Sequence, residues 1–183
     1  MNGDDDPDVA VLARIAGGDA GSCSVLVDRH LSRLHALATR LLDNGADADE
    51  VCQDAFVRAW QQAPKWQGGK ARFSTWLHQV ALNLCRDRLR ARRESVPIDA
   101  IVEAVDDRDT PEQAHGRADR VQSVRAALAT LPERQREALV LCHFQGMTNI
   151  EAAALLELSV DALESLLARA RRGMREAMMG ART

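Results

Sequence analysis

The sequence predicts an all-α protein of two small helical domains joined by a flexible linker. Apolar residues recur every three or four positions along most of the 183-residue chain, which is the period of a buried helical face. Aromatic residues make up only 3%, tyrosine is absent, and the alternation that would indicate strands is missing. Residues 94–109 lack the helical period and contain Pro97, so we expect a linker over residues 94–111 to separate the two domains.

Charge is distributed unevenly along the chain, although the formal net charge is only −3. Residues 65–93 are strongly basic, residues 94–119 are acidic, and the C-terminal part is basic again. Two basic modules joined by an acidic connector favour nucleic-acid contacts at two places. No apolar run approaches the length of a membrane span and the start is acidic, so we expect a soluble, cytoplasmic protein without membrane insertion.

Four helices are predicted before the linker, over residues 9–16, 20–42, 47–63 and 74–93, after a flexible acidic arm at residues 1–9. Glycine or proline follows each of the first three segments and should end those helices. Asp47 with Glu50, and Ser74, stand where N-terminal caps are expected. The inner face of the second helix should consist of Val27, Leu31, Leu34, Ala38 and Leu41.

Two further helices are predicted directly after the linker. Thr110-Pro111-Glu112-Gln113 has a capping threonine, a proline suited to the first turn, and a glutamine at the third position, so it should start a helix. That helix should end at Leu131-Pro132 and be lined by Val121, Val124 and Leu128. A second segment follows from Glu133 to Phe144 and closes at a glycine.

Residues 148–178 have the pattern of a helix-turn-helix. Thr148 with Glu151 forms a capping box before a short apolar helix, and Ser159 can cap the longer helix that follows. The buried stripe of this longer helix is expected to be Leu163, Leu167, Ala170, Met174 and Met178. A helix-turn-helix whose second helix carries an arginine run is suited to enter a major groove and hold phosphates.

The cysteines and histidines do not form a recognisable site. The cysteines are widely spaced, without a CxxC pair, and are Cys23, Cys52, Cys85 and Cys142. We expect reduced thiols that serve as small core residues. A dispersed zinc site using His30, His35, His78 or His143, or regulation by thiol oxidation, is the less favoured alternative. Because no catalytic constellation is found, no enzyme activity, metal, cofactor or small-molecule substrate is expected.

Three motifs in order resemble those of one protein family. They are DADEVCQDAFVRAWQQAPKW at residues 47–66, FSTWLHQVALNLCRDRLRARR at residues 73–93, and LPERQREALVLCHFQGMTNIEAAALLELSVDALESLLARARRGM at residues 131–174. The chain resembles the extracytoplasmic-function (ECF, group IV) sigma factors of bacterial RNA polymerase, within the sigma-70 family. The resemblance implies a sigma-2 domain at residues 10–93, a sigma-4 domain at residues 112–178, and a tail at residues 179–183.

The resemblance implies a core-polymerase-binding surface on the third predicted helix. The matching positions are Asp49, Glu50, Gln53, Asp54 and Trp60. An acidic face meeting a basic coiled coil of the polymerase would provide steering and register. Without the resemblance, an ordinary solvated helix face explains the same residues.

The resemblance also implies that the basic loop at residues 65–73 and the fourth helix open and read the promoter −10 element. The candidate residues are Lys65, Trp66, Lys70, Arg72, Phe73, Trp76, Asn83, Arg86 and Arg90. Cations can hold a displaced strand, and aromatic rings can stack on unpaired bases. Trp66 and Phe73 are expected to be exposed, whereas Trp76 is expected in the core. Loop aromatics that only seal a core remain an alternative.

The second helix of the helix-turn-helix would read the −35 element. Its candidate contact residues are Asp161, Glu164, Ser165, Ala168, Arg169, Arg171 and Arg172. Family members commonly carry Thr, a basic residue, Arg and His where this chain has Ala162, Glu164, Leu166 and Ala168, so no −35 sequence is predicted. Family members also have glycine where this chain has Glu157, which costs about 1 kcal/mol if its φ is positive.

The function implied is that of a promoter-specificity subunit that binds core RNA polymerase and promoter DNA under the control of an anti-sigma factor. Two other classes are considered. A dimeric helix-turn-helix regulator would explain residues 148–178 but not the acidic helix or the aromatic basic loop. A sigma-mimicking adaptor that never binds DNA is favoured only by the atypical recognition helix.

Overall fold

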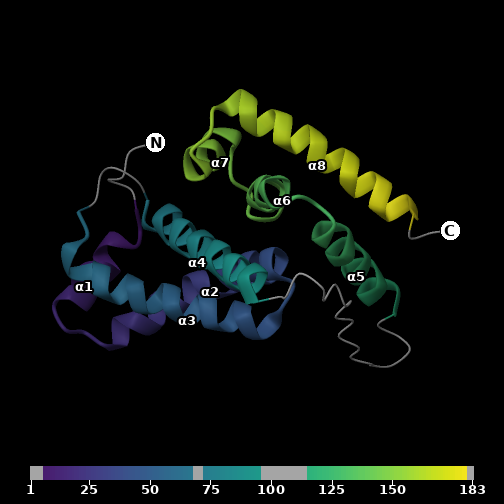
Figure 1. Ribbon diagram of the computed structural model, residues 1–183. Coiled ribbons are helices and arrows are strands. Elements are labelled where there is room, and N and C mark those ends of the chain that lie inside the picture. Colours follow the sequence, from purple (N-terminus) through teal and green to yellow (C-terminus); the bar gives the residue numbers. More distant parts are fainter. Residues whose placement is uncertain (1–5, 68–71, 96–114, 181–183) are drawn as a thin grey trace.

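The computed structural model describes residues 6–67, 72–95 and 115–180, and every regular element within them is a helix (Figure 1). This confirms the predicted fold class. The first domain contains α1 Val9–Ala16, α2 Gly21–Leu42, α3 Gly45–Gln62, the short 3₁₀ helix η2 Ala63–Lys65, and α4 Phe73–Ser95. The second contains α5 His115–Ala129, α6 Glu133–Leu139, the π-helix η3 Val140–Phe144, α7 Asn149–Leu156 and α8 Val160–Gly180. Lys70, the Thr110–Gln113 helix start and most of the predicted linker lie outside the described residues.

Helices α2, α3 and α4 pack together as a three-helix bundle, and α1 covers α2 and η2. Alanines at the buried positions of α3, such as Ala48 and Ala55, let the neighbouring helices approach closely. The predicted inner face of α2 is wrong at Leu31, which is exposed. The buried face is formed by Leu26, Leu34 and Leu37 together with His30. Leu31 follows His30 by one position, so its side chain points away from this face and toward solvent.

Two helix starts in the first domain differ from the prediction. Asn44, not Asp47, caps α3, because its side-chain oxygen accepts the Asp47 N–H at 3.2 Å. The Asp47 carboxylate is instead hydrogen-bonded to Arg92. Helix α4 begins at Phe73, two residues earlier than a Ser74 cap requires, and its first N–H group is bound by Asp6. The arm predicted to be flexible is therefore fixed at residues 6–8.

In the second domain, α8 lies across α5 and α6, and α7 packs beside its first half (Figure 1). The segment predicted as one helix at residues 133–144 ends as a π-helix, in which the Gln145 N–H donates to the Val140 carbonyl at 3.0 Å. The prediction that Val121 lines the core is wrong, since this residue is 64% exposed. Leu128, near the C-terminal end of α5, is buried.

The helix-turn-helix agrees closely with its predicted caps. Thr148 and Glu151 make both bonds of the capping box, and the Ser159 hydroxyl accepts the Ala162 N–H at 3.1 Å. Glu157 occupies the turn with φ +56°, the conformation for which glycine is favoured. The predicted stripe of α8 is buried from Leu163 to Ala170, but Met178 is exposed. The last turns of α8 extend beyond the helices that cover its first part.

Candidate nucleic-acid interface

The outward face of α8 carries the predicted −35 residues. All seven are exposed, namely Asp161, Glu164, Ser165, Ala168, Arg169, Arg171 and Arg172. The Arg169 Nε donates to the Ser165 carbonyl at 3.2 Å, and the Arg171 Nε lies 3.3 Å from His143 Nε2. The guanidinium groups thus project from the C-terminal half of an open helical face, where phosphates could reach them.

Glu164 is held by the first residue of α7. The Asn149 side-chain nitrogen donates to its carboxylate at 3.2 Å, which joins the two helices of the motif. The four positions that depart from the family pattern have different environments. Glu164 and Ala168 are exposed, whereas Ala162 and Leu166 are half-buried. The unusual residues therefore change both the outward face and the packing beneath it.

The aromatic residues of the predicted −10 region form a cluster at the start of α4. Phe73 is 0% exposed, so the prediction that it is exposed is wrong. Its ring centroid lies 5.3 Å from Trp66 and 5.5 Å from Trp76. Trp66 and Trp76 are half-buried and pack against the core, which agrees with the expectation for Trp76 only. Edge-to-face packing of aromatic rings seals this end of the bundle.

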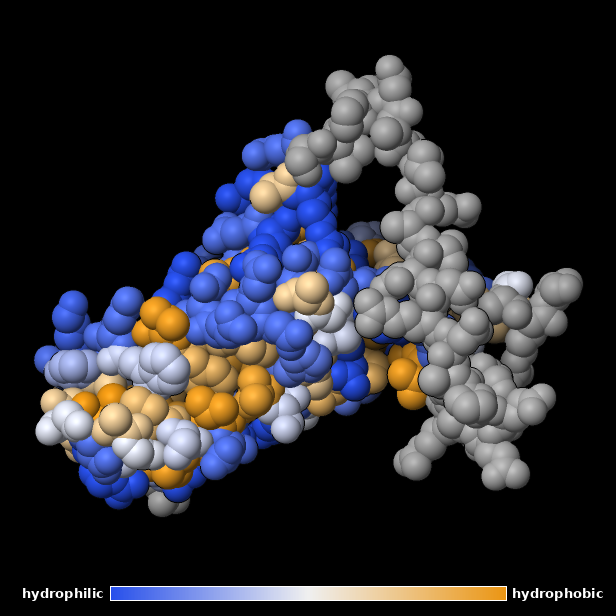
Figure 2. All heavy atoms as spheres, turned by 90° about the horizontal axis from the view of Figure 1, so that it is seen from below, coloured by the Kyte–Doolittle hydropathy of each residue, from blue (hydrophilic) through white to orange (hydrophobic). Residues whose placement is uncertain are grey.

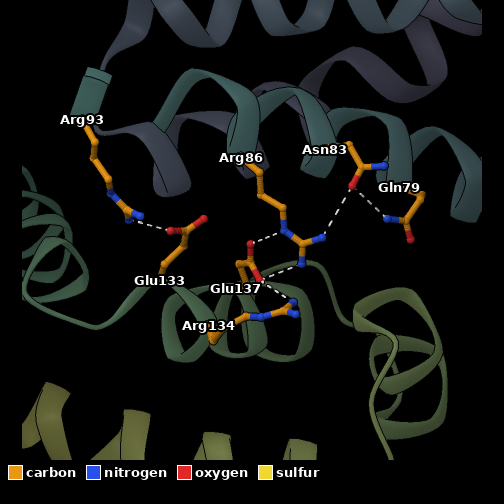
Figure 3. Close-up of polar contacts among 7 residues, drawn as sticks. All are labelled: Gln79, Asn83, Arg86, Arg93, Glu133, Arg134 and Glu137. Carbon is orange, nitrogen blue, oxygen red and sulfur yellow. Dashed lines mark hydrogen bonds and ion pairs between the residues drawn. The ribbon is translucent and has the colours of Figure 1, made fainter. Parts of the chain in front are cut away.

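The predicted −10 cations do not share one environment. Lys65 and Arg90 are exposed, and Arg90 lies 3.5 Å from Asp87 in an exposed ion pair. Arg72 is half-buried, and Lys70 lies outside the described residues. Asn83 is exposed, but its side-chain oxygen accepts hydrogen bonds from Gln79 and Arg86 (Figure 3).

Arg86 is engaged by the second domain instead of facing solvent. Its Nε and Nη2 atoms donate to the two carboxylate oxygens of Glu137 on α6, at 2.6 and 2.9 Å (Figure 3). These hydrogen bonds raise the pKa of Arg86 above its ordinary value. The Glu137 side chain is 2% exposed, and Arg134 adds a contact at 3.5 Å. Nearby, Arg93 is paired with Glu133 at 2.6 Å.

Gln145 makes a second connection between the domains. Its carbonyl accepts from Arg33 at 2.9 Å, and its side-chain nitrogen donates to the Arg33 carbonyl at 3.1 Å. Its side-chain oxygen lies 3.3 Å from His78 Nε2, and burial lowers the pKa of His78. Sequence reasoning missed both Glu137 and Gln145. The available signal was a glutamate four residues before buried Leu141, at a helical spacing that places it on the buried side.

The predicted core-polymerase residues lie along one exposed face of α3. Asp49, Glu50, Gln53, Asp54 and Trp60 are all exposed. Arg88 of α4 donates to Glu50 at 2.6 Å and to Asp54 at 3.4 Å, so part of this acidic face is already paired. Exposed apolar side chains accompany it, including Val57. The face that α1, α2 and α3 present in Figure 2 accordingly mixes hydrophobic and hydrophilic side chains.

The remaining candidate groups do not converge. Within the described residues, no three or more His, Cys, Asp or Glu side chains are arranged to hold a metal ion. All four cysteines are free thiols, and burial raises the pKa of Cys52 to about 11 and that of Cys85 to about 12. In the same part of the chain, no helix combines the length and apolar character needed to cross a membrane.

Two helical domains, one with an exposed helix-turn-helix and one with a basic helix, define a two-domain helix-turn-helix protein. Sigma-70 region 2 matches residues 26–95, and Sigma-70 region 4 matches residues 122–174. The ECF RNA polymerase sigma factor SigE of Mycolicibacterium smegmatis is 31% identical over 94% of this chain and 68% of its own. The chain therefore belongs to the ECF group of the sigma-70 family, and its function is that of an alternative sigma factor.

Other relatives cover both domains. The RNA polymerase sigma factor CnrH of Cupriavidus metallidurans is 32% identical over 91% of this chain and 92% of its own. The structure of CnrH in complex with the cytosolic domain of CnrY matches with a TM-score of 0.70 and 30% identity, over 97% of this chain and all of that one. The sigma factor RpoE of Bartonella quintana, solved with the anti-sigma factor NepR, has the same fold, with a TM-score of 0.65 and 22% identity over 85% of this chain and 96% of that one.

Proposed function

We propose that this protein directs core RNA polymerase to promoters through a sigma-2 domain at residues 10–93 and a sigma-4 domain at residues 112–178. In this proposal residues 94–111 are the linker, and residues 1–9 and 179–183 are the terminal extensions. The protein would act in the cytoplasm as a transcription factor without catalytic activity of its own. An anti-sigma partner is proposed because RpoE was solved with the anti-sigma factor NepR, and CnrH with the cytosolic domain of CnrY.

The observation that carries this proposal is the open face of α8. Its seven candidate residues are all exposed, and α7, which begins with a complete capping box, contacts α8 through the hydrogen bond from Asn149 to Glu164. Arg169, Arg171 and Arg172 would hold phosphates, which positions the helix without specifying a sequence. Ser165 and Glu164 would contact base edges, and Glu164 could accept a hydrogen bond from a cytosine amino group.

The −10 contacts would come from the region between Lys65 and Arg90. Trp66 and Trp76 are partly exposed and could stack on unpaired bases, while buried Phe73 would support them from beneath. Arg86 could reach a DNA strand only after Glu137 releases it. We therefore propose that the two domains separate when the protein binds polymerase.

The acidic face of α3 would bind a basic surface of core polymerase. Asp49, Glu50, Gln53 and Asp54 supply polar contacts, and Trp60 adds an amphipathic anchor of the kind enriched at interface centres. Arg88, which pairs with Glu50 and Asp54 in the free chain, would exchange these partners or remain as a bridge.

Run-off transcription with purified core polymerase and a promoter library tests the proposal. Arg172→Ala should weaken transcription from −35-dependent promoters, whereas Arg175→Ala, an exposed arginine one turn further along α8, should have little effect. Glu164→Lys should change −35 preference. Duplex binding without core polymerase would support a simple helix-turn-helix regulator, and partner binding without transcription or DNA binding would support an adaptor.

A further inference from the structure

We propose that Asp6 is a positioning residue for the promoter-opening part of the first domain. It holds the start of α4 by capping that helix from a distant part of the chain. The inference rests on the proposed function for its consequence at the promoter. Its structural basis is a set of contacts that the N-terminal segment makes with α2 and α4.

The start of α4 obtains its cap from outside its own sequence. The first N–H groups of a helix lack partners within the helix, and a side-chain oxygen usually supplies one from the preceding residue. Here the preceding residue is Arg72, whose side chain has no acceptor. Asp6, 67 residues away in sequence, accepts the Phe73 N–H with Oδ2 at 2.6 Å. A carboxylate at this position also meets the positive end of the helix dipole.

The Asp6 carboxylate is itself held in place. Asp6 is only 8% exposed, and its Oδ1 accepts the N–H of Asp8 at 3.1 Å. Asp8 is 2% exposed and contacts α2, with one oxygen 2.7 Å from His30 Nε2 and the other accepting from Arg29 at 2.9 Å. Arg29 also donates to the Pro7 carbonyl at 3.0 Å. The segment is therefore bound to α2 through Pro7 and Asp8 and to α4 through Asp6.

Electrostatics strengthen this attachment at neutral pH. Burial raises the pKa of Asp8, but hydrogen bonds and charge interactions with His30 and Arg29 outweigh it and hold the pKa below its ordinary value. Asp8 is thus ionised when the protein is at neutral pH, and its two partners remain bound. Because Arg29 and His30 hold Asp8, they also restrict where Asp6, two residues earlier, can lie.

The capped residue is the centre of the aromatic cluster. The Phe73 ring centroid lies 6.0 Å from His30 on α2 and 5.3 Å from Trp66, the residue at the other side of the basic loop. Trp66 in turn lies 5.7 Å from Trp76. Because Asp6 fixes the backbone of Phe73, it fixes where the basic loop joins α4 and how the two half-buried tryptophans are oriented.

The test compares three variants of the full chain assembled with core polymerase. Asp6→Ala removes the acceptor, Asp6→Asn retains one, and Asp19→Ala removes another aspartate cap of the same domain. Asp19 accepts the Gly21 N–H at 3.0 Å and the Ser22 hydroxyl at 2.7 Å at the start of α2. Permanganate reactivity of unpaired thymines at the −10 element reports promoter opening, and a separate titration reports affinity for core polymerase.

Asp6→Ala should lower the equilibrium constant for promoter opening roughly two- to thirtyfold, the change expected from a lost cap. Asp6→Asn should recover most of this loss, and Asp19→Ala should open promoters nearly like the wild type. All three should keep wild-type affinity for core polymerase. The inference is overturned if Asp6→Ala opens promoters like Asp19→Ala, or if all three lose activity in proportion to their thermal stability.

A second measurement keeps the inference separate from the proposed function. If the wild-type chain opens no promoter with core polymerase, the proposed function fails. Hydrogen exchange of the Phe73 amide in the full chain then still tests the cap, because it needs neither polymerase nor DNA. Exchange should be slow in the wild type and several-fold faster in Asp6→Ala, with little change in Asp19→Ala. Equal exchange in all chains overturns the positioning role.

Discussion

The contact between Arg86 and Glu137 should decide whether the two domains stay together in the free protein. Arg86→Ala leaves Glu137, whose side chain is 2% exposed, without its two hydrogen bonds of 2.6 and 2.9 Å. Removing one partner of a buried ion pair costs about 3–5 kcal/mol. Arg134 remains 3.5 Å away, so we expect the lower end of this range, about 3 kcal/mol. Separation of the domains would relieve the cost by hydrating Glu137.

A change of about 3 kcal/mol shifts the equilibrium constant more than a hundredfold toward the separated form. Small-angle scattering should therefore give a larger radius of gyration for Arg86→Ala than for the wild type. Arg90→Ala is the matched control, because it removes the same charge from the same helix but breaks only an exposed pair with Asp87. Equal radii and equal stabilities for the two variants would refute the reasoning.

Three further predictions concern caps and thiols. Thr148→Ala should destabilise the second domain by about 1 kcal/mol in urea unfolding. The backbone N–H and the hydroxyl of Thr148 donate to Glu151 and lower its pKa, so this stabilisation is present above the unfolded pKa of about 4.3 and lost as pH falls through the folded value. Thr148→Ala removes only the hydroxyl contact, so it should weaken this pH dependence without abolishing it. At pH 8 a thiol reagent should modify half-buried Cys23 and Cys142 well before Cys52 and Cys85, and rapid modification of all four without denaturant would contradict the assigned burial. Glu157→Gly should relieve strain at φ +56° and raise the free energy of unfolding by less than about 1 kcal/mol, because glycine also increases unfolded-chain entropy; a lower free energy of unfolding would show that the glutamate side chain stabilises the turn.

Local patterns predicted the helices because their causes are local. The three- to four-residue period, the Thr148–Glu151 capping box and the Ser159 cap all operate within one or two turns, and the structure contains them. Predictions of burial were wrong at Leu31, Val121 and Met178, which are exposed although they lie on the predicted apolar stripes. A helix can keep its apolar period beyond the surface that buries it, so periodicity alone does not define the extent of a core.

The contacts that link distant segments could not be predicted in this way. Asp6 capping Phe73 and Glu137 binding Arg86 join residues 67 and 51 positions apart, respectively. Side-chain periodicity contains no information about such pairs, because the partner of a carboxylate depends on how the helices assemble. The candidate α8 face was predictable since exposure there follows from the helical period. The paired state of Arg86 and the burial of Phe73 were not.

The connection between residues 6 and 73 also bears on how the chain folds during synthesis. The N-terminal segment leaves the ribosome first and can associate with α2 as soon as that helix emerges. When Phe73 follows, the Asp6 carboxylate is already in place to accept its N–H group, so the start of α4 can be capped as soon as it forms. A chain that lacks the first eight residues would form the helical bundle with the start of α4 frayed, and proteases should cleave first at that helix end.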